Sequence, residues 1–371
     1  MSSIKTVTDK SKSGIHHLLR LYHPRTWREK GIVWSIGLGL ATYLVVTLIL
    51  WAYWDQEPDL FDVRANALTM AGGEQTKLVP GYATTATVIR IADTLLHKPG
   101  GYLSNDVTPP AIFMDNMLSW EFGVVIELRD TVRALRNDFS RAQTQSAEDR
   151  DLMTADAKLH FDMAHWILPA TEQEYQKAID ALSRYMARLG AGQRGDAKFF
   201  ARGDNLNAYL AVVEKRLGDM AQRLSANVRQ LRVNSELAGD KKAASSTAPP
   251  EAVASNPWLE IDNVFREVTV STPWMEIDNV FFEARGYVWA LVHVLKAIEV
   301  DFRDMLQGKN ALLPLRRIIH KLENTQQAVW SPTILNNTGF GMLTNHSLIM
   351  ASYMSRANAA IIDLRILLTQ G

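Results

Sequence analysis

The sequence predicts an all-α membrane protein, with a single N-terminal transmembrane helix followed by a multi-helix bundle. First, a run of 24 residues without a charge begins at Gly31 and ends at Trp54. Second, apolar residues in the rest of the chain recur at helical spacings of three, four and seven. Third, no stretch sustains the period-two alternation of a half-buried strand, so no sizeable sheet is expected.

The uncharged run is predicted to cross the lipid bilayer from Gly31 to Trp54. At about 1.5 Å per residue it spans roughly 36 Å, enough for a hydrocarbon core of about 30 Å. Trp51, Tyr53 and Trp54 cluster at its exit, where amphipathic rings favour the membrane–water interface. A buried core helix is the alternative, but such a helix would be unusually long and apolar.

The flanking charges predict the orientation of this helix. Residues 1–30 hold seven Lys and Arg against two acidic residues, whereas the other flank opens with Asp55, Glu57, Asp59 and Asp62. The positive-inside rule therefore makes residues 1–30 a cytoplasmic tail and places residues 55–371 on the far side of the membrane. The run is too long for a cleaved signal peptide and no A-x-A pattern follows it, so it is predicted to be an uncleaved signal anchor.

Composition predicts the compartment and excludes some partners. The chain has no cysteine, which rules out disulfides, iron–sulfur clusters and thiolate metal sites. Large eukaryotic ectodomains usually contain cysteine, so a bacterial inner membrane with the bundle in the periplasm fits better. The tail takes seven of 40 basic and two of 40 acidic residues, which leaves residues 31–371 a net charge of about −5. This charge gives no electrostatic reason to bind nucleic acid.

Residues 55–233 are predicted to form a first helical region, with helices at residues 82–97, 114–142, 148–163, 171–189 and 204–228. The first of these ends at a K-P-G-G stop signal, and the fourth begins with T-E-Q-E, the pattern of a capping box. Glu121 interrupts the apolar stripe of the second helix. Partial exposure or a buried ion pair would explain it structurally; a functional carboxylate is the alternative.

Residues 234–256 are predicted to be a flexible linker, because residues 238–255 lack aromatics and are rich in Ala, Ser, Pro and Lys. An internal repeat follows: PWLEIDNVFR at residues 257–266 and PWMEIDNVFF at residues 273–282 share eight of ten residues. Two copies are too few for a solenoid, so a local tandem duplication is the better explanation. We expect Phe281 of the second copy to be buried and Phe265 of the first to be only partly packed.

Residues 257–371 are predicted to form a second helical region that packs on the first, with helices at residues 274–306, 312–327 and 343–368. The first of these is apolar nearly all round except for His293, which predicts a central, well-buried helix. In the last helix Arg356 and Asp363 are seven residues apart. They are predicted to share a face and form a buried polar seam, more plausibly a structural ion pair than a site.

A search for catalytic motifs finds no phosphate-binding loop, dinucleotide-binding, nucleophile-elbow or H-E-x-x-H pattern. His160 and His165 are five apart, the wrong spacing for a zinc pair on one helical face. No catalytic, cofactor-binding or metal-binding residue is assigned, and no cofactor is expected. The residues kept as candidates for a polar seam or for ligand contacts are Glu121, Glu283, Arg285, His293, Arg356 and Asp363.

Several long segments resemble a known family. They include VPGYATTATVIRIADTLLHKPGGYLSNDVTPP, NMLSWEFGVVIELRDTVRALRNDFSRAQTQS, WILPATEQEYQKAIDALSRYMARL, PWMEIDNVFFEARGYVWALVHVLKAIEVDF and NHSLIMASYMSRANAAIIDLR. The chain resembles, over nearly its whole length, the proteobacterial inner-membrane family catalogued as domain of unknown function 2333. This resemblance implies the same membrane, but no activity or catalytic residue comes with it. It also implies that members of the family carry the PW-x-x-ID motif once. The additional copy at residues 257–266 would then be a departure from the family pattern.

Two classes of function remain open. We favour a non-enzymatic interaction or scaffold module of the cell envelope, with another envelope protein or a second copy of the chain as partner. The alternative is a periplasmic enzyme or small-ligand binder that acts on lipid or peptidoglycan precursors. A deep pocket lined by the candidate residues would favour the alternative, and an exposed apolar groove would favour the module. A tail of 30 residues is too short for a signalling domain, which excludes a self-contained receptor kinase.

Overall fold

The computed structural model describes residues 30–142, 147–244, 277–327 and 346–370, together with Tyr22, His23 and Trp27; for residues 226–244 it describes the backbone. Over these ranges the regular structure is helical and no strand occurs. The all-α prediction is therefore confirmed. The first copy of the repeat, with Phe265, and the second half of the predicted linker lie outside the described residues.

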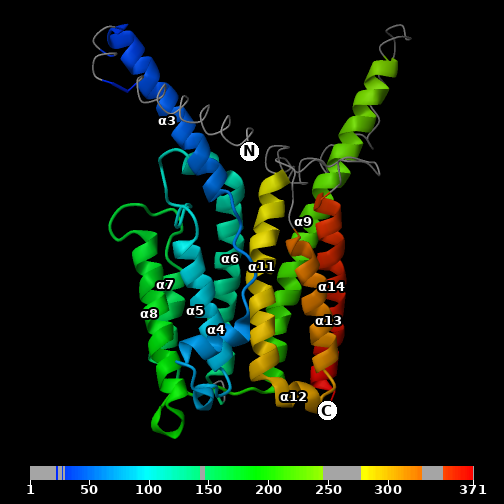
Figure 1. Cartoon of the computed structure of the whole chain (residues 1–371). Helices are drawn as coiled ribbons and strands as arrows, with labels where there is room; N and C mark the ends of the chain where they lie inside the picture. Colours follow the sequence, from blue (N-terminus) through cyan, green and yellow to red (C-terminus); the bar gives the residue numbers. More distant parts are fainter. Residues whose placement is uncertain are drawn as a thin grey trace, which may run out of the picture.

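The apolar run forms α3 (Ile32–Trp54), which leaves the bundle at one end (Figure 1). None of its side chains is fully buried, and its length and hydropathy are sufficient to cross a membrane. Trp54 at its end is half-buried and packs against the core of the bundle. The apolar helix thus leads directly into the packed domain.

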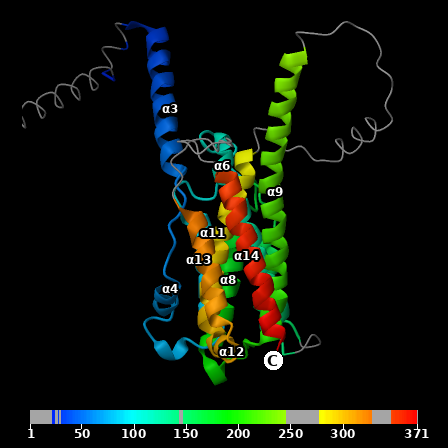
Figure 2. The same cartoon turned by 90° about the vertical axis from the view of Figure 1, so that its right-hand side faces the viewer.

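Eight helices of the described chain run alternately away from and toward the end where α3 leaves (Figures 1 and 2). In chain order they are α5 (Tyr82–His97), α6 (Asp115–Ala134), α7 (Arg150–Leu159), α8 (Thr171–Gly190), α9 (Gly203–Ala244), α11 (Ile277–Asp301), α13 (Leu312–Glu323) and α14 (His346–Thr369). Two short helices, α4 (Val63–Met70) and α12 (Arg303–Gly308), lie toward the opposite end (Figure 1). The result is an up-and-down helical bundle.

Helix α11 is the centre of the bundle and packs against α5, α6, α9 and α13. Nearly every side chain from Val280 to Ile298 is buried, on all sides of the helix. This confirms the central helix that its uninterrupted apolar sequence predicted. Phe281 is 3% exposed, so its predicted burial is confirmed as well.

The backbones of α6 and α11 touch through two glycines. A Cβ atom added to Gly123 of α6 would lie 2.0 Å from the carbonyl oxygen of Glu283, and one added to Gly286 of α11 would lie 2.0 Å from that of Trp120. Both distances are far below a van der Waals contact. Only glycine therefore permits this approach of the two helices.

Several helix boundaries differ from the prediction, among them the end of α7, which lies at Leu159 rather than at residue 163. The long helix after the repeat ends at Asp301 and α12 begins at Arg303, while α6 gives way at Leu135 to a single π-helical turn that ends at Phe139. Helix α9 runs on to Ala244, past the expected end at residue 228 and into the predicted linker. Residues 229–244 contain no proline, and eleven of them are Ala, Leu, Arg, Lys, Gln or Glu, so local propensity favours continuing the helix.

The predicted capping box at the start of α8 is wrong. The N-cap is Ala170, and the Thr171 hydroxyl donates instead to the carbonyl oxygens of Asp162 and His165, at 2.8 and 3.0 Å. The Glu174 carboxylate accepts from two lysines rather than reaching back to the helix start. Contacts with the preceding loop therefore replace the local cap.

The glycine contact generates a stability prediction. Gly286→Ala should lower the free energy of unfolding by about 3 kcal/mol, because the new methyl group must push two backbones apart. Urea unfolding of the full chain in detergent, followed by circular dichroism, measures this loss. Gly308→Ala is the control: it is also helical, but a Cβ there meets nothing within 4 Å, so a change within about 1 kcal/mol is expected. Equal midpoints for the two variants would contradict the contact.

Candidate functional site

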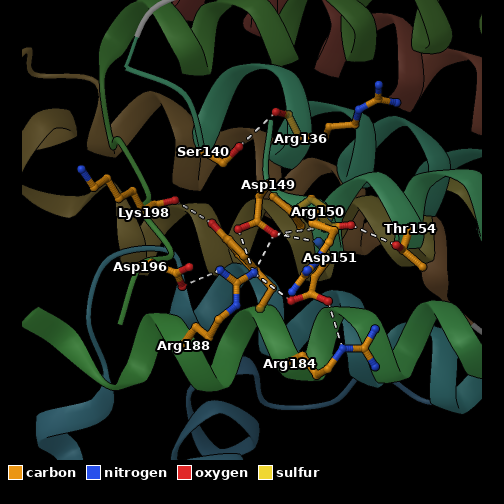
Figure 3. Close-up of polar contacts among 12 residues, drawn as sticks. Arg136, Ser140, Asp149, Arg150, Asp151, Thr154, Arg184, Arg188, Asp196 and Lys198 are labelled. Carbon is orange, nitrogen blue, oxygen red and sulfur yellow. Dashed lines mark hydrogen bonds and ion pairs between the residues drawn. The ribbon is translucent and has the colours of Figure 1, made fainter. Parts of the chain in front are cut away.

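A depression of about 540 Å³ lies where the start of α7 meets the end of α8, toward the end of the bundle away from α3. Its lining is polar and consists of Ser140, Ala142, Ala147, Glu148, Asp149, Arg150, Arg188, Asp196, Lys198 and Phe200. Figure 3 shows Arg188 rising from α8 among three carboxylates. We call Asp149, Asp151, Arg184, Arg188 and Asp196 the Arg188 cluster.

The Arg188 cluster is held by hydrogen bonds between its own members. Arg188 Nη2 donates to Asp149 at 2.7 Å and to Asp151 at 2.8 Å, and its Nη1 donates to Asp196 at 2.8 Å (Figure 3). Arg184 donates to Asp151 at 2.9 Å. Asp149 is also the N-cap of α7, where its side chain accepts two backbone N–H groups. The cluster therefore joins the start of α7 to the end of α8.

The charges in this cluster stabilise one another. Burial would raise the pKa of Asp151, but hydrogen bonds from Arg184 and Arg188 outweigh it and lower that pKa below its usual range. Burial likewise opposes the charge on Arg188, yet hydrogen bonds to Asp149 and Asp196 leave the pKa of Arg188 raised. Asp151 is thus an ionised partner of arginine and is poorly suited to act as a general base.

Glu121, which interrupted the apolar stripe of α6, forms a buried ion pair. Its carboxylate lies 2.7 Å from Lys98 Nζ, and both side chains are fully buried. It also accepts the backbone N–H groups of Leu103 and Ser104, at 2.9 and 2.8 Å. Burial raises the pKa of Glu121, against the effect of Lys98. The structure thus shows the buried ion pair and not the partial exposure that was the other structural explanation for Glu121. Through this pair, the chain that follows α5 is attached to α6.

Arg285 and His293 both hold the segment between α3 and α4 against α11. Arg285 Nη2 lies 2.6 Å from a Glu57 carboxylate oxygen, and Nη1 donates to the Thr325 carbonyl at 2.9 Å. The His293 ring stacks on Phe61 with 3.9 Å between centroids, and its Nε2 accepts the Phe61 N–H at 3.0 Å. Burial lowers the pKa of His293 to about 3, so the ring is neutral at physiological pH.

The other three candidates lie apart from these residues. Glu283 accepts two hydrogen bonds from Arg223 of α9, at 2.7 and 2.5 Å. Arg356 and Asp363 are both exposed on α14, so the predicted buried seam is wrong. The error is one of helix rotation, because the buried side chains are those one position later, Ala357 and Leu364.

The polar contact between α14 and α9 is made by Arg365, which the sequence did not single out. Its Nε donates to Asn207 at 2.9 Å, and Nη1 pairs with Glu214. Both partners come from α9, more than a hundred residues earlier in the chain. Only the tertiary fold brings these groups together.

Glu127 is a second residue that the sequence analysis missed. It is fully buried in α6, and it accepts from the Tyr209 hydroxyl at 2.5 Å and from the Thr131 hydroxyl at 2.9 Å. Burial raises the pKa of Glu127 to about 8, so the carboxyl is mostly protonated at neutral pH. Within the described ranges, no group of three or more His, Asp or Glu side chains is placed to hold a metal ion.

In a comparison with known protein families, the chain matches a family described as uncharacterized proteins conserved in bacteria. The match covers residues 27–271 and 266–371. The chain therefore belongs to this family, domain of unknown function 2333. The two matched pieces overlap at residues 266–271, from the last residue of the first copy of the repeat into the segment between the copies. No curated protein and no solved structure matches the chain.

The raised pKa of Glu127 generates a pH prediction. The native carboxyl stays protonated up to about pH 8, whereas in the unfolded chain it ionises near 4.5. Its stabilising contribution is therefore complete below pH 4.5 and is lost as the pH rises to about 8. Gln cannot ionise, so Glu127→Gln should gain stability relative to the wild type across this window, by up to about 1.4 kcal/mol per pH unit.

Urea unfolding of both proteins at a series of pH values measures this difference. Glu74→Gln, at an exposed side chain of the same type, is the control and should follow the wild type at every pH. A Glu127→Gln difference that stays constant between pH 5 and pH 8 would mean that native Glu127 is ionised.

Proposed function

We propose that the chain is a single-pass protein of the bacterial inner membrane, with a cytoplasmic N-terminus and a periplasmic bundle that binds another envelope protein or a second copy of itself. The basic residues before α3 and the acidic residues after it support this orientation. The packing of Trp54 against the bundle supports an anchor that is retained rather than cleaved.

The observation that carries a non-enzymatic function is the dispersal of the interior polar groups. Catalytic and small-ligand sites gather a few polar groups around one concave pocket. Here the buried Glu121 binds the loop after α5, the buried Arg285 and His293 bind the segment between α3 and α4, and Glu283 is paired with Arg223 of α9. These residues connect structural elements, which is the role expected in a rigid interaction module.

A groove between α9 and α14 offers a surface for a protein partner. It has a volume of about 350 Å³ and is lined by Gly218, Ala221, Gln222, Ser225, Ser355, Asn358, Ala359 and Ile362. Most of these side chains are small, so the helix of a partner could approach the backbone closely. Ile362 is 40% exposed and Ile366, one turn on, is 47% exposed. We call this surface the α9–α14 groove.

Site-specific photo-cross-linking in living cells tests the interaction. A photoreactive residue at Ser355 or Ile362 should give a discrete adduct, which mass spectrometry then identifies as an envelope protein or a second copy. The same residue at Leu313 of α13, which is 63% exposed, is the control and should give none. If no adduct forms at Ser355 or Ile362, the proposed groove is wrong. A small-molecule adduct there would favour the alternative, an enzyme or ligand binder.

The proposed orientation makes a separate prediction. Alkaline phosphatase fused after Gly371 should be active, because that enzyme matures only outside the cytoplasm, and green fluorescent protein at the same position should stay dark. The same two reporters fused before Met1 should behave in the opposite way. A fluorescent, phosphatase-negative C-terminus would overturn the proposed topology.

A further inference from the structure

Exposed apolar side chains gather on two loops, one between α5 and α6 and the other between α7 and α8. They are Val107, Ile112, Phe113, Trp166, Ile167 and Leu168, with exposed fractions of 54 to 79%. Both loops lie at the end of the bundle where α3 leaves it (Figure 1). Soluble proteins rarely expose so many large apolar groups close together without a binding role. We call these six residues the apolar rim.

The end of α3 is in contact with the first of these loops. A Cβ atom added to Gly100 would lie 2.8 Å from the indole of Trp54, the last residue of α3. Tryptophan at the end of a membrane helix marks the level of the lipid headgroups. Gly100 has φ +85°, a conformation that favours glycine, so backbone conformation and the close indole both constrain this position. The loop after α5 therefore lies at the depth of the membrane–water interface.

The two loops are bound to each other and to the bundle. The Tyr102 hydroxyl donates to the carbonyl oxygen of Met163 at 3.1 Å, and Asn105 Nδ2 donates to Glu172 at 2.7 Å. The buried pair of Lys98 and Glu121 fixes the beginning of the first loop. The apolar rim is thus held in place by the fold, and little further ordering is needed for it to meet a partner.

The charges beside the apolar rim indicate how it would contact lipid. Asp106 and Asp162 are exposed on these two loops and Asp115 is exposed at the start of α6, and bacterial membranes contain anionic lipid that repels them. Electrostatic attraction therefore does not explain contact with a membrane, whereas burial of six large apolar side chains does.

We propose that the apolar rim inserts into the headgroup region of the leaflet next to the bundle and fixes the orientation of the bundle on the membrane. This inference rests on the proposed anchoring by α3. The lipid bilayer is the assigned occupant because α3 leaves the domain at this end and its last residue contacts the same loop. The bundle would then be attached at two places, through α3 and through the rim, rather than held by a single flexible tether.

The absence of cysteine from the chain makes single-cysteine labelling a direct test. Phe113→Cys, Ile167→Cys, Leu313→Cys and Val45→Cys would each carry an environment-sensitive fluorophore in the full chain, reconstituted in vesicles of phosphatidylethanolamine and phosphatidylglycerol. Leu313 is the matched control, because it is 63% exposed against 69% for Phe113 and is the second residue of α13, which begins beside α12 toward the opposite end of the bundle. Val45 lies within α3 and reports the anchor itself.

Labels at Phe113 and Ile167 should be quenched by nitroxide-bearing lipids and protected from aqueous iodide, about 5–10 Å into the boundary between headgroups and acyl chains. The label at Leu313 should show the reverse. If Val45 reports lipid while Phe113 and Ile167 behave like Leu313, the inserted rim is wrong and the anchor stands. If Val45 also fails, the anchoring is wrong and the rim fails with it. Protection of Phe113 and Ile167 from both quenchers would overturn the lipid assignment and indicate a protein covering the rim.

Discussion

The backbone contact between α6 and α11 is the constraint on which the rest of the bundle depends. Gly123 and Gly286 let the two helices meet at main-chain distance, and this sets the position of α11, which also packs against α5, α9 and α13. At the same level Trp120 and Trp289 pack with 5.2 Å between ring centroids. Two residues near Gly286 form ion pairs with other elements. Glu283 pairs with Arg223 of α9, and Arg285 pairs with Glu57 in the segment after α3. A larger residue at either glycine would displace all of these contacts together.

Buried polar groups serve as connectors in this fold. A helical bundle can bury its apolar stripes in several registers, but an ion pair such as that of Lys98 and Glu121 is satisfied in only one. Removal of one partner from a buried pair typically costs about 3–5 kcal/mol, because the other charge stays in a medium of low polarity. Glu121, Arg285 and His293 therefore specify where the loops and the segment after α3 lie, even if hydrophobic burial supplies most of the stability.

Features that depend on local sequence could be predicted, and those that depend on a distant partner could not. The helix at residues 82–97 was predicted to the residue, because a K-P-G-G turn ends it. Glu121 was recognised as unusual, but Lys98 could not be named as its partner without the fold. The exposed pair of Arg356 and Asp363 was misjudged because a period of seven fixes a shared face and not which face is buried. Glu127 gave no signal, since its partner Tyr209 is 82 residues away.

Helix α8 connects the loops that carry the apolar rim with the Arg188 cluster and relates both to the proposed membrane. Near the start of α8, Glu172 accepts a hydrogen bond from Asn105 in the loop between α5 and α6, which carries part of the apolar rim. Near the end of α8, Arg188 binds the carboxylates of the Arg188 cluster, toward the opposite end of the bundle. Its 20 residues correspond to about 30 Å, with ion pairs at both ends to limit fraying. A bundle attached through both α3 and the rim would thus hold the Arg188 cluster at a fixed height, roughly one bilayer-core thickness above the headgroups. The α9–α14 groove runs along the same axis, so a partner bound there would be oriented relative to the membrane by the same attachment.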